Sequence, residues 1–271
     1  SYGDTYPMYN GAIGMTYEQA GHSSGGLTVI KNDGDTLTLK DRIAHHFTTS
    51  MSTIEMASVY QTKLISEFQN YFTTAKNVGY SSYKSFVIKG DDTVRRNAFL
   101  NTLEKNGIVY TSVGADRNVS ANGFEYNTAK ENAFSITKGD IIIQNKQSKS
   151  SMVKVLLEPQ TKLPDSATYD ITAWSLPYVY GLNAFACKNE IPNGEEITIT
   201  KISNRPTSYG YAFRWSGVNA ASFLGKLLQK NCVLKFAEQP FLMGNENFER
   251  GTILVLPSTK NNMNDIDGIM G

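Results

Sequence analysis

The sequence has few of the residues that build disulfide frameworks and metal centres. Its 271 residues include two cysteines and three histidines. Two cysteines are too few for a disulfide scaffold, so they leave the redox compartment undecided. A chain of this length buries enough apolar surface to fold without a disulfide or a metal. We therefore expect an ordinary hydrophobic core.

An excess of charge of one sign is also absent. Lys and Arg number 26 against 25 Asp and Glu, a formal net charge of +1. Proteins that bind nucleic acid or a membrane surface attract it with a field of one sign, so we expect neither partner. No apolar run approaches the roughly 20 residues of a membrane-spanning helix, so no membrane span is predicted. The first residues also lack the basic and apolar regions of a signal peptide.

The three histidines do not form a recognisable zinc site. A catalytic zinc takes about three protein ligands, and an H-x-x-E or H-x-x-x-H pair places two of them on one helix face. None of His22, His45 and His46 is followed by Glu three residues later. His45 and His46 are adjacent, so on a helix they point about 100° apart. Packing or hydrogen bonding is the simpler interpretation of this pair.

A nucleophilic serine or cysteine has weak support. Residues 21–25 match the G-x-S-x-G elbow of serine hydrolases at Ser23, but residues 27–30, where a helix should follow, favour a strand. No acid followed by a distant histidine comes later, so a Gly/Ser surface loop is the simpler interpretation and catalytic Ser23 the alternative. Cys187 and Cys232 lie in no glycine elbow, which predicts small core residues.

Short strands and then a long helix are predicted for the first part of the chain. The first 35 residues are rich in Gly and Tyr, which is typical of strands and turns. Thr38 and Asp41 have the spacing of a capping box, with Asp in place of Glu, so a helix should begin there. Apolar residues then recur at three- and four-residue steps up to Phe72, as one buried stripe requires. A run of Ser and Thr favours a break near residues 57–58.

A polar, turn-rich stretch at residues 77–84 predicts a domain boundary, with one domain at 1–76 and the other at 77–271. After it, residues 86–88 are typical of a buried strand, and Asp91 or Asp92 can cap a helix that ends at Gly107. Residues 108–113 favour a second strand. A strand, helix and strand joined by such a crossover predict a parallel sheet.

This pattern recurs at a spacing of about 125 residues. Residues 86–89 correspond to 211–214, residues 108–110 to 233–235, and both halves continue into a hairpin-like piece. We therefore predict two α/β units, each with a β appendage, between residues 85 and 271. Between the units, residues 151–157 favour a short helix. Asp170 or Thr172 could cap another, which Pro177 would limit or kink.

Glu18 is a lone carboxylate in an apolar, aromatic stretch that favours a strand, just before a glycine-rich loop. The simpler interpretation is an exposed acid at the end of a strand. The alternative is a carboxylate at the mouth of a cleft, whose apolar walls would raise its pKa into the range of a general base. The residues alone leave both open.

Residues 10–21 (NGAIGMTYEQAG) and 35–47 (DTLTLKDRIAHHF) resemble the end of the catalytic domain in a bacterial branch of the zinc carboxypeptidases, the carboxypeptidase A-like metallopeptidases. In that family this segment supplies the catalytic glutamate, and Glu18 stands at the matching place. The resemblance implies hydrolysis of C-terminal peptide bonds, in which Glu18 accepts a proton from a zinc-activated water and delivers it to the leaving amine. The zinc ligands, an H-x-x-E pair and a later His, and an Arg for the substrate carboxylate would precede Ser1.

Residues 169–177 and 236–241 resemble the flavodoxin-like module, similar to class I glutamine amidotransferases, that follows the peptidase domain in this branch. Neither cysteine lies in the glycine elbow of an amidotransferase nucleophile, so that activity is not implied. The predicted fold class is α/β. A flavodoxin-like parallel-sheet domain with β-hairpin appendages follows the last strand and long helix of the peptidase domain.

The resemblance thus implies a segment of a zinc metallocarboxypeptidase that is inactive alone, because the zinc ligands lie outside it. Its partners would be a peptide substrate and the N-terminal part of the peptidase domain, in the periplasm or outside the cell. The alternative is a non-enzymatic α/β module that binds cell-wall peptide or a protein partner, with contacts near residues 170–177.

Overall fold

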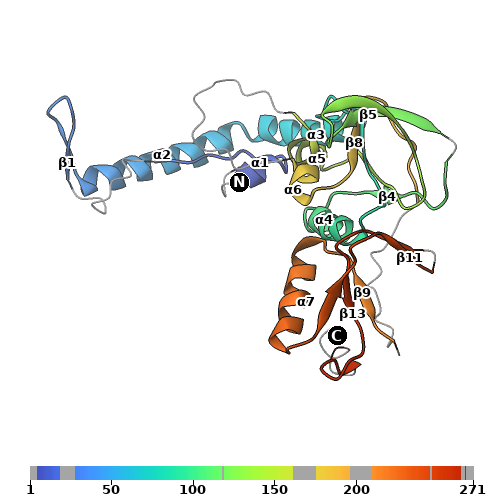
Figure 1. Ribbon diagram of the computed structural model, residues 1–271. Helices are drawn as coiled ribbons and strands as arrows, with labels where there is room; N and C mark the ends of the chain where they lie inside the picture. Colours follow the sequence, from blue (N-terminus) through green and yellow to red (C-terminus); the bar gives the residue numbers. More distant parts are fainter. Residues whose placement is uncertain are drawn as a thin grey trace.

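The computed structural model has a mixed α/β architecture, with a six-stranded sheet, a three-stranded sheet and two small two-stranded ribbons among the described residues. Figure 1 shows helices α2 and α3 as a rod that projects from the body formed by the sheets. The structure describes residues 5–18, 28–117, 119–160, 175–195, 209–244, 246–263 and 266. In this part of the chain no helix is both long enough and apolar enough to cross a bilayer.

The N-terminal part contains α1 (Thr5–Met8), a ribbon of β1 (Val29–Ile30) and β2 (Thr36–Leu37), α2 (Leu39–Val59) and α3 (Gln61–Asn77). The predicted capping box is confirmed: the Asp41 N–H donates to Thr38 Oγ1 (3.3 Å), and the Thr38 N–H donates to Asp41 Oδ2 (2.9 Å). The predicted break lies at Tyr60, between the two helices.

The six-stranded sheet has the order β4-β7-β3-β8-β5-β6. Its strands are β3 (Ser85–Ile88), β4 (Thr111–Ser112), β5 (Ser120–Glu125), β6 (Lys130–Ser135), β7 (Ile141–Gln144) and β8 (Ala184–Cys187). The helices around it are α4 (Thr93–Lys105), α5 (Ser150–Leu157) and α6 (Leu176–Tyr180). As predicted, Asp92 caps α4, and Gly107 follows its C-terminus with a positive φ of 66°.

The predicted flavodoxin-like parallel sheet is wrong for the described residues, because every strand pair among them is antiparallel. Strands β3 and β4 do run in the same direction, as a crossover through α4 requires. However, β7 lies between them and pairs antiparallel with both. Ser112 at the end of β4 lies opposite Ile141 at the start of β7, so β7 runs back between β3 and β4, and the β5–β6 hairpin is an insertion between β4 and β7. The local pattern of strand, helix and strand does not encode this arrangement.

The core has two layers, one on each face of β3. Phe86 and Ile88 point to one face, where they pack in a cluster with Phe99, Leu100 and Leu103 of α4. Val87 alternates to the other face and belongs to a cluster with Phe134, Ile142 and Phe185. All four residues of β3 are buried, so apolar side chains must cover both of its faces: those of α4 and α5 on one face, and those of β6, β7 and β8 that cluster with Val87 on the other.

The second unit confirms the predicted repeat. It consists of β9 (Tyr211–Phe213), α7 (Gly217–Gln229), β10 (Leu234–Phe236), β11 (Phe241–Met243), β12 (Glu246–Phe248) and β13 (Ile253–Val255). Its sheet order, β10-β13-β9, is that of β4-β7-β3. The register also agrees, since Ile88 lies opposite Ile141 and Phe213 opposite Ile253.

The two units contact each other where their helices begin. Asp92 Oδ1 accepts the Arg95 N–H (3.0 Å) and so caps α4, while Asp92 Oδ2 accepts the hydroxyl of Ser216 (2.8 Å), the residue before α7. One carboxylate therefore caps α4 and also bonds the residue before α7, close to two helix N-termini where the dipoles favour negative charge.

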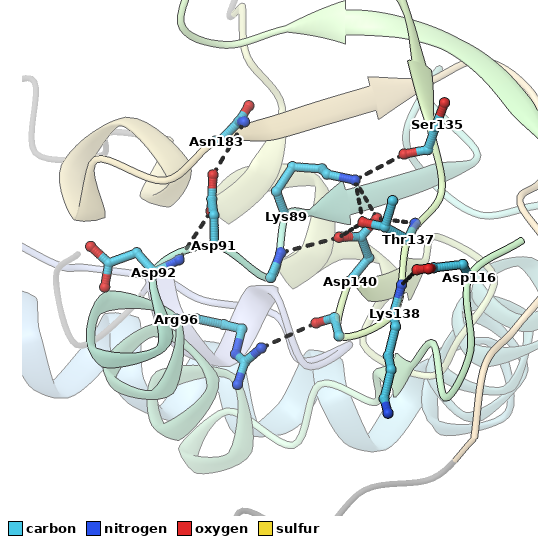
Figure 2. A network of polar contacts seen from close by, with 12 residues as sticks. Lys89, Asp91, Asp92, Arg96, Asp116, Ser135, Thr137, Lys138, Asp140 and Asn183 are labelled. Atoms are coloured by element: carbon cyan, nitrogen blue, oxygen red, sulfur yellow. Dashed lines mark hydrogen bonds and ion pairs between the residues drawn. The ribbon is translucent and has the colours of Figure 1, made fainter. Parts of the chain in front are cut away.

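A buried ion pair holds the end of β3 to the turn before β7 (Figure 2). Asp140 is completely buried and accepts Lys89 Nζ (2.5 Å) and the N–H groups of Gly90 (3.1 Å) and Thr137 (2.9 Å). The second unit lacks this pair because Thr252 follows the corresponding turn glycine. Of the two units, only the first therefore has this buried ion pair among the described residues.

Replacing Asp140 by Ala should lower the free energy of unfolding by about 3–5 kcal/mol, because it leaves the mostly buried Lys89 ammonium without its counter-charge. Urea denaturation measures this change. Glu190→Gln is the matched control, since it breaks the exposed pair of Glu190 with Lys146 and should leave the midpoint nearly unchanged. Equal effects of the two substitutions would contradict a structural role for the buried pair.

Candidate functional site

Glu18 lies at the end of an irregular segment, residues 12–18, that runs along α2 (Figure 1). Its side chain is exposed. The neighbouring Tyr17 hydroxyl is 2.5 Å from Thr53 Oγ1 on α2. The strand expected at Glu18 is therefore not formed among the described residues, because a strand needs a neighbouring strand to pair with and here the segment's neighbour is a helix.

An open groove lies between this segment and the helices α2 and α3. It has a volume of about 1420 Å³. Apolar walls are contributed by Met8, Ile13, Met15, Met56, Tyr60 and Phe68. Glu18 is not one of the lining residues, so the alternative of a carboxylate enclosed by apolar walls is not realised here. The groove itself is wide enough to receive an extended chain or an apolar ligand.

The apolar side chains of α2 are exposed, although their helical spacing predicted a buried stripe. We call Ile43, Phe47, Met51 and Ile54 the α2 stripe; they are 61%, 67%, 49% and 63% exposed. The long helices α2 and α3 bury only Arg42 and Ala75, whereas the shorter α4 buries three apolar residues. The structure thus confirms the predicted helix. The prediction that its apolar stripe is buried is wrong, because no described element covers the stripe.

The residues described do not supply a zinc site. Among them no group of three or more His, Cys, Asp or Glu is placed to hold a metal ion. On α2, His45 is exposed and His46 is half-buried. His22 and Ser23 lie outside the described residues. The donor set present therefore does not fit a resident zinc.

Burial makes the thiol of Cys187 unreactive. Cys187 lies in β8 and is completely buried. Removal from water, followed by the nearby charge of Glu131, raises its pKa to about 12, so almost no thiolate is present at neutral pH. Cys232 is half-buried beside the core of the second unit. Both positions agree with the core residues predicted and not with a nucleophile.

Residues 170–177, where the binding-module alternative places its contacts, fall largely outside the described part of the chain. Asp170 and Thr172 lie there, so neither is assigned as a cap. Ser175 is the N-cap of α6, and Pro177 lies in the first helical turn instead of limiting the helix. Proline is tolerated in that turn because the N–H it lacks has no partner within the helix.

Three contacts that join the N-terminal segment to the body carried no signal in the sequence. The Tyr71 hydroxyl donates to the carbonyl of Tyr9 (2.7 Å), Lys149 Nζ donates to Asn10 Oδ1, and the Tyr6 hydroxyl donates to Asn106 Oδ1 (3.3 Å). The partners are 62 to 139 residues apart in the sequence, so no local motif could reveal them.

Comparison with protein families, with curated proteins and with solved structures finds no match for this chain. Function is therefore inferred from the residues themselves.

In a Cys232→Ser variant, the remaining thiol should react with a disulfide reagent at pH 8 far more slowly in the folded protein than in urea. Burial both shields the sulfur from the reagent and raises its pKa to about 12, so little thiolate is present. Absorbance of the released thiolate measures the reaction. Addition of urea should release full reactivity, and rapid labelling of Cys187 in the folded chain would contradict its burial.

Proposed function

We propose that this chain is a C-terminal segment of a zinc metallocarboxypeptidase that hydrolyses C-terminal peptide bonds, with Glu18 as the general base and acid. The observation that carries the proposal is an exposed carboxylate, Glu18, on a segment that lies along a helical module with almost no core of its own. Helices α2 and α3 expose the α2 stripe and bury two residues. Exposed apolar surface of this kind is typical of an interface with another part of a protein.

The partner that fits this surface is the remainder of the peptidase domain, which would carry the metal ligands. No step of the reaction is assigned to a metal here, because the described residues do not hold one. The carboxylate of Glu18 is exposed and can therefore reach a bound substrate. A carboxylate in this role accepts the proton of the attacking water and returns it to the leaving amine.

Residues 77–271 enter the proposal as an accessory α/β domain without amidotransferase activity. The thiol of Cys187 is buried and protonated, which argues against a catalytic cysteine at that position. In this proposal the likeness to the flavodoxin-like module is limited to strand–helix–strand units such as β3, α4 and β4, whose two strands point the same way but have β7 between them.

A non-enzymatic module that binds peptide is the second candidate. The apolar groove along α2, with a volume of about 1420 Å³, favours it because an extended peptide could lie there without any chemistry at Glu18. Mapping of protected residues with bound peptide separates the candidates: protection at Glu18 favours the peptidase, and protection only near residues 170–177 or in the groove favours the binding module. Labelling by a fluorophosphonate would revive the third alternative, a serine hydrolase using Ser23.

This chain, supplied with zinc, should show no turnover of a peptide with a free C-terminal carboxylate. Joined to the part that carries the metal ligands, it should be active, and Glu18→Gln should lower kcat by about 10²–10⁴ with little change in KM. Release of the C-terminal amino acid measures both results. Glu55→Gln, an exposed carboxylate on α2, is the matched control. Turnover by this chain alone, or full activity of the Glu18 variant, would contradict the proposal.

Phe47→Ala should leave the free energy of unfolding of this chain within about 0.5 kcal/mol of its original value, because the side chain is already exposed. Phe99→Ala, a phenylalanine buried on α4, should cost about 3–5 kcal/mol. Urea denaturation compares the two. A loss at Phe47 as large as that at Phe99 would show that the α2 stripe is already covered within this chain, and the proposed interface would then be lost.

A further inference from the structure

The segment that ends at Glu18 is held at both ends. At its start, the Tyr71 hydroxyl donates to the Tyr9 carbonyl and Lys149 Nζ donates to Asn10 Oδ1. At its far end, the Tyr17 hydroxyl contacts Thr53 Oγ1 on α2. Residues 9–17 are therefore fixed between the body and a point on α2 near the middle of that helix.

Gly11 fits closely against the aromatic rings of α3. Its φ of +85° suits glycine, and a Cβ at this position would lie 2.9 Å from Tyr71 Cδ1 and 3.3 Å from ring atoms of Phe68 and Phe72. Phe68 and Tyr71 both pack edge-on against Phe72, at centroid distances of 5.0 and 5.1 Å. The chain thus turns at one defined place before it runs along the rod.

The segment contacts the rod between its two anchors. Residues 9–11 form a turn in which the Ala12 N–H donates to the Pro7 carbonyl (3.1 Å), and an irregular stretch follows. Ala12, Ile13 and Met15 of this stretch line the groove between the segment and the helices. The course of residues 12–17 along the rod therefore depends on how the turn is held at Tyr9 and Asn10.

We infer that the α/β body positions the segment carrying Glu18, and that Lys149 and Tyr71 are its positioning residues. This inference rests on the proposed function for its catalytic meaning, although the anchoring itself does not depend on it. The body can act in this way because Lys149 directly precedes α5, whose residues Met152, Val153 and Leu157 are buried in the main core. The accessory domain is then required for the geometry of the candidate catalytic carboxylate.

Tyr71 is itself tied to the same part of the body. Its carbonyl accepts the Tyr80 hydroxyl (3.0 Å), and the Tyr80 N–H donates to Ser150 Oγ (2.8 Å) at the start of α5. Ser150 is completely buried and its hydroxyl also donates to Asn145 Oδ1 (2.7 Å). Both positioning residues are therefore attached to one rigid corner of the fold.

Hydrogen–deuterium exchange of this chain tests the inference without any measurement of activity. Lys149→Met should speed exchange at the amides of residues 9–18 by about tenfold, because one anchor is lost. Lys149→Arg should keep the exchange rates of the original chain, since a guanidinium can donate to Asn10 Oδ1. Lys154→Met removes an exposed lysine from α5, the helix that Lys149 precedes. It is the matched control and should leave the exchange rates unchanged.

Two further variants remove other groups that hold the start of the segment. Asn10→Leu removes the acceptor for Lys149, and Tyr71→Phe removes the bond to Tyr9; each should speed exchange over the same residues. Unchanged exchange at residues 9–18 in Lys149→Met and in both of these variants would overturn the inference. Faster exchange confined to residues 9–11, with residues 12–18 unaffected, would also overturn it, because the anchor would then not reach Glu18.

The outcome is separable from that of the proposed function. If Glu18→Gln leaves the completed enzyme fully active, the peptidase role fails while the exchange result still decides the anchoring. If the exchange is unchanged and Glu18→Gln abolishes activity, the peptidase role stands and the positioning by the body is refuted.

Discussion

The burial of β3 on both of its faces is the constraint on which the rest of the structure depends. Its four residues are buried, with Phe86 and Ile88 on one side and Val87 on the other, so the strand is stable only between two apolar layers. Helices α4 and α5 cover one side, and apolar side chains of β6, β7 and β8 cluster with Val87 on the other. Asn106, which follows α4, and Lys149, which precedes α5, bond to the N-terminal module, and Ser150 bonds to Tyr80 beside it. A core formed around one strand thus fixes the base from which the rod of α2 and α3 projects.

The N-terminal module follows a different physical rule. Thr38 and Asp41 cap the first turn of α2, whereas α3 has no side-chain cap, and the α2 stripe stays exposed. Most helices in proteins gain their stability from an apolar face that packs against a neighbour. An apolar face without a described neighbour, next to an exposed carboxylate on an extended segment, is the combination that makes the peptidase proposal physically reasonable.

Local signals were sufficient for the ends of elements and for the repeat. Asp91 or Asp92 was predicted as the cap of α4, which proved to be Asp92, and Gly107 as its terminator. The spacing of about 125 residues indicated two units, and the structure shows that they share strand order and register. Strand partners were not predictable, because the insertion of β7 between β3 and β4 depends on which segment best fills the sheet. The candidate site was predictable only as Glu18; its surroundings, and the anchors at Lys149 and Tyr71, join residues far apart in the chain.

The sequence by itself determined the elements whose energetics lie within about one turn of chain: capped helices, turn glycines, short apolar strands and the carboxylate at Glu18. The tertiary structure alone decided the antiparallel order of the sheets, the exposure of the α2 stripe and the anchoring of the segment from Tyr9 to Tyr17. The physical reason is that capping and turn formation involve neighbouring residues. Strand pairing, burial and anchoring are set by groups that meet only after the whole chain has folded.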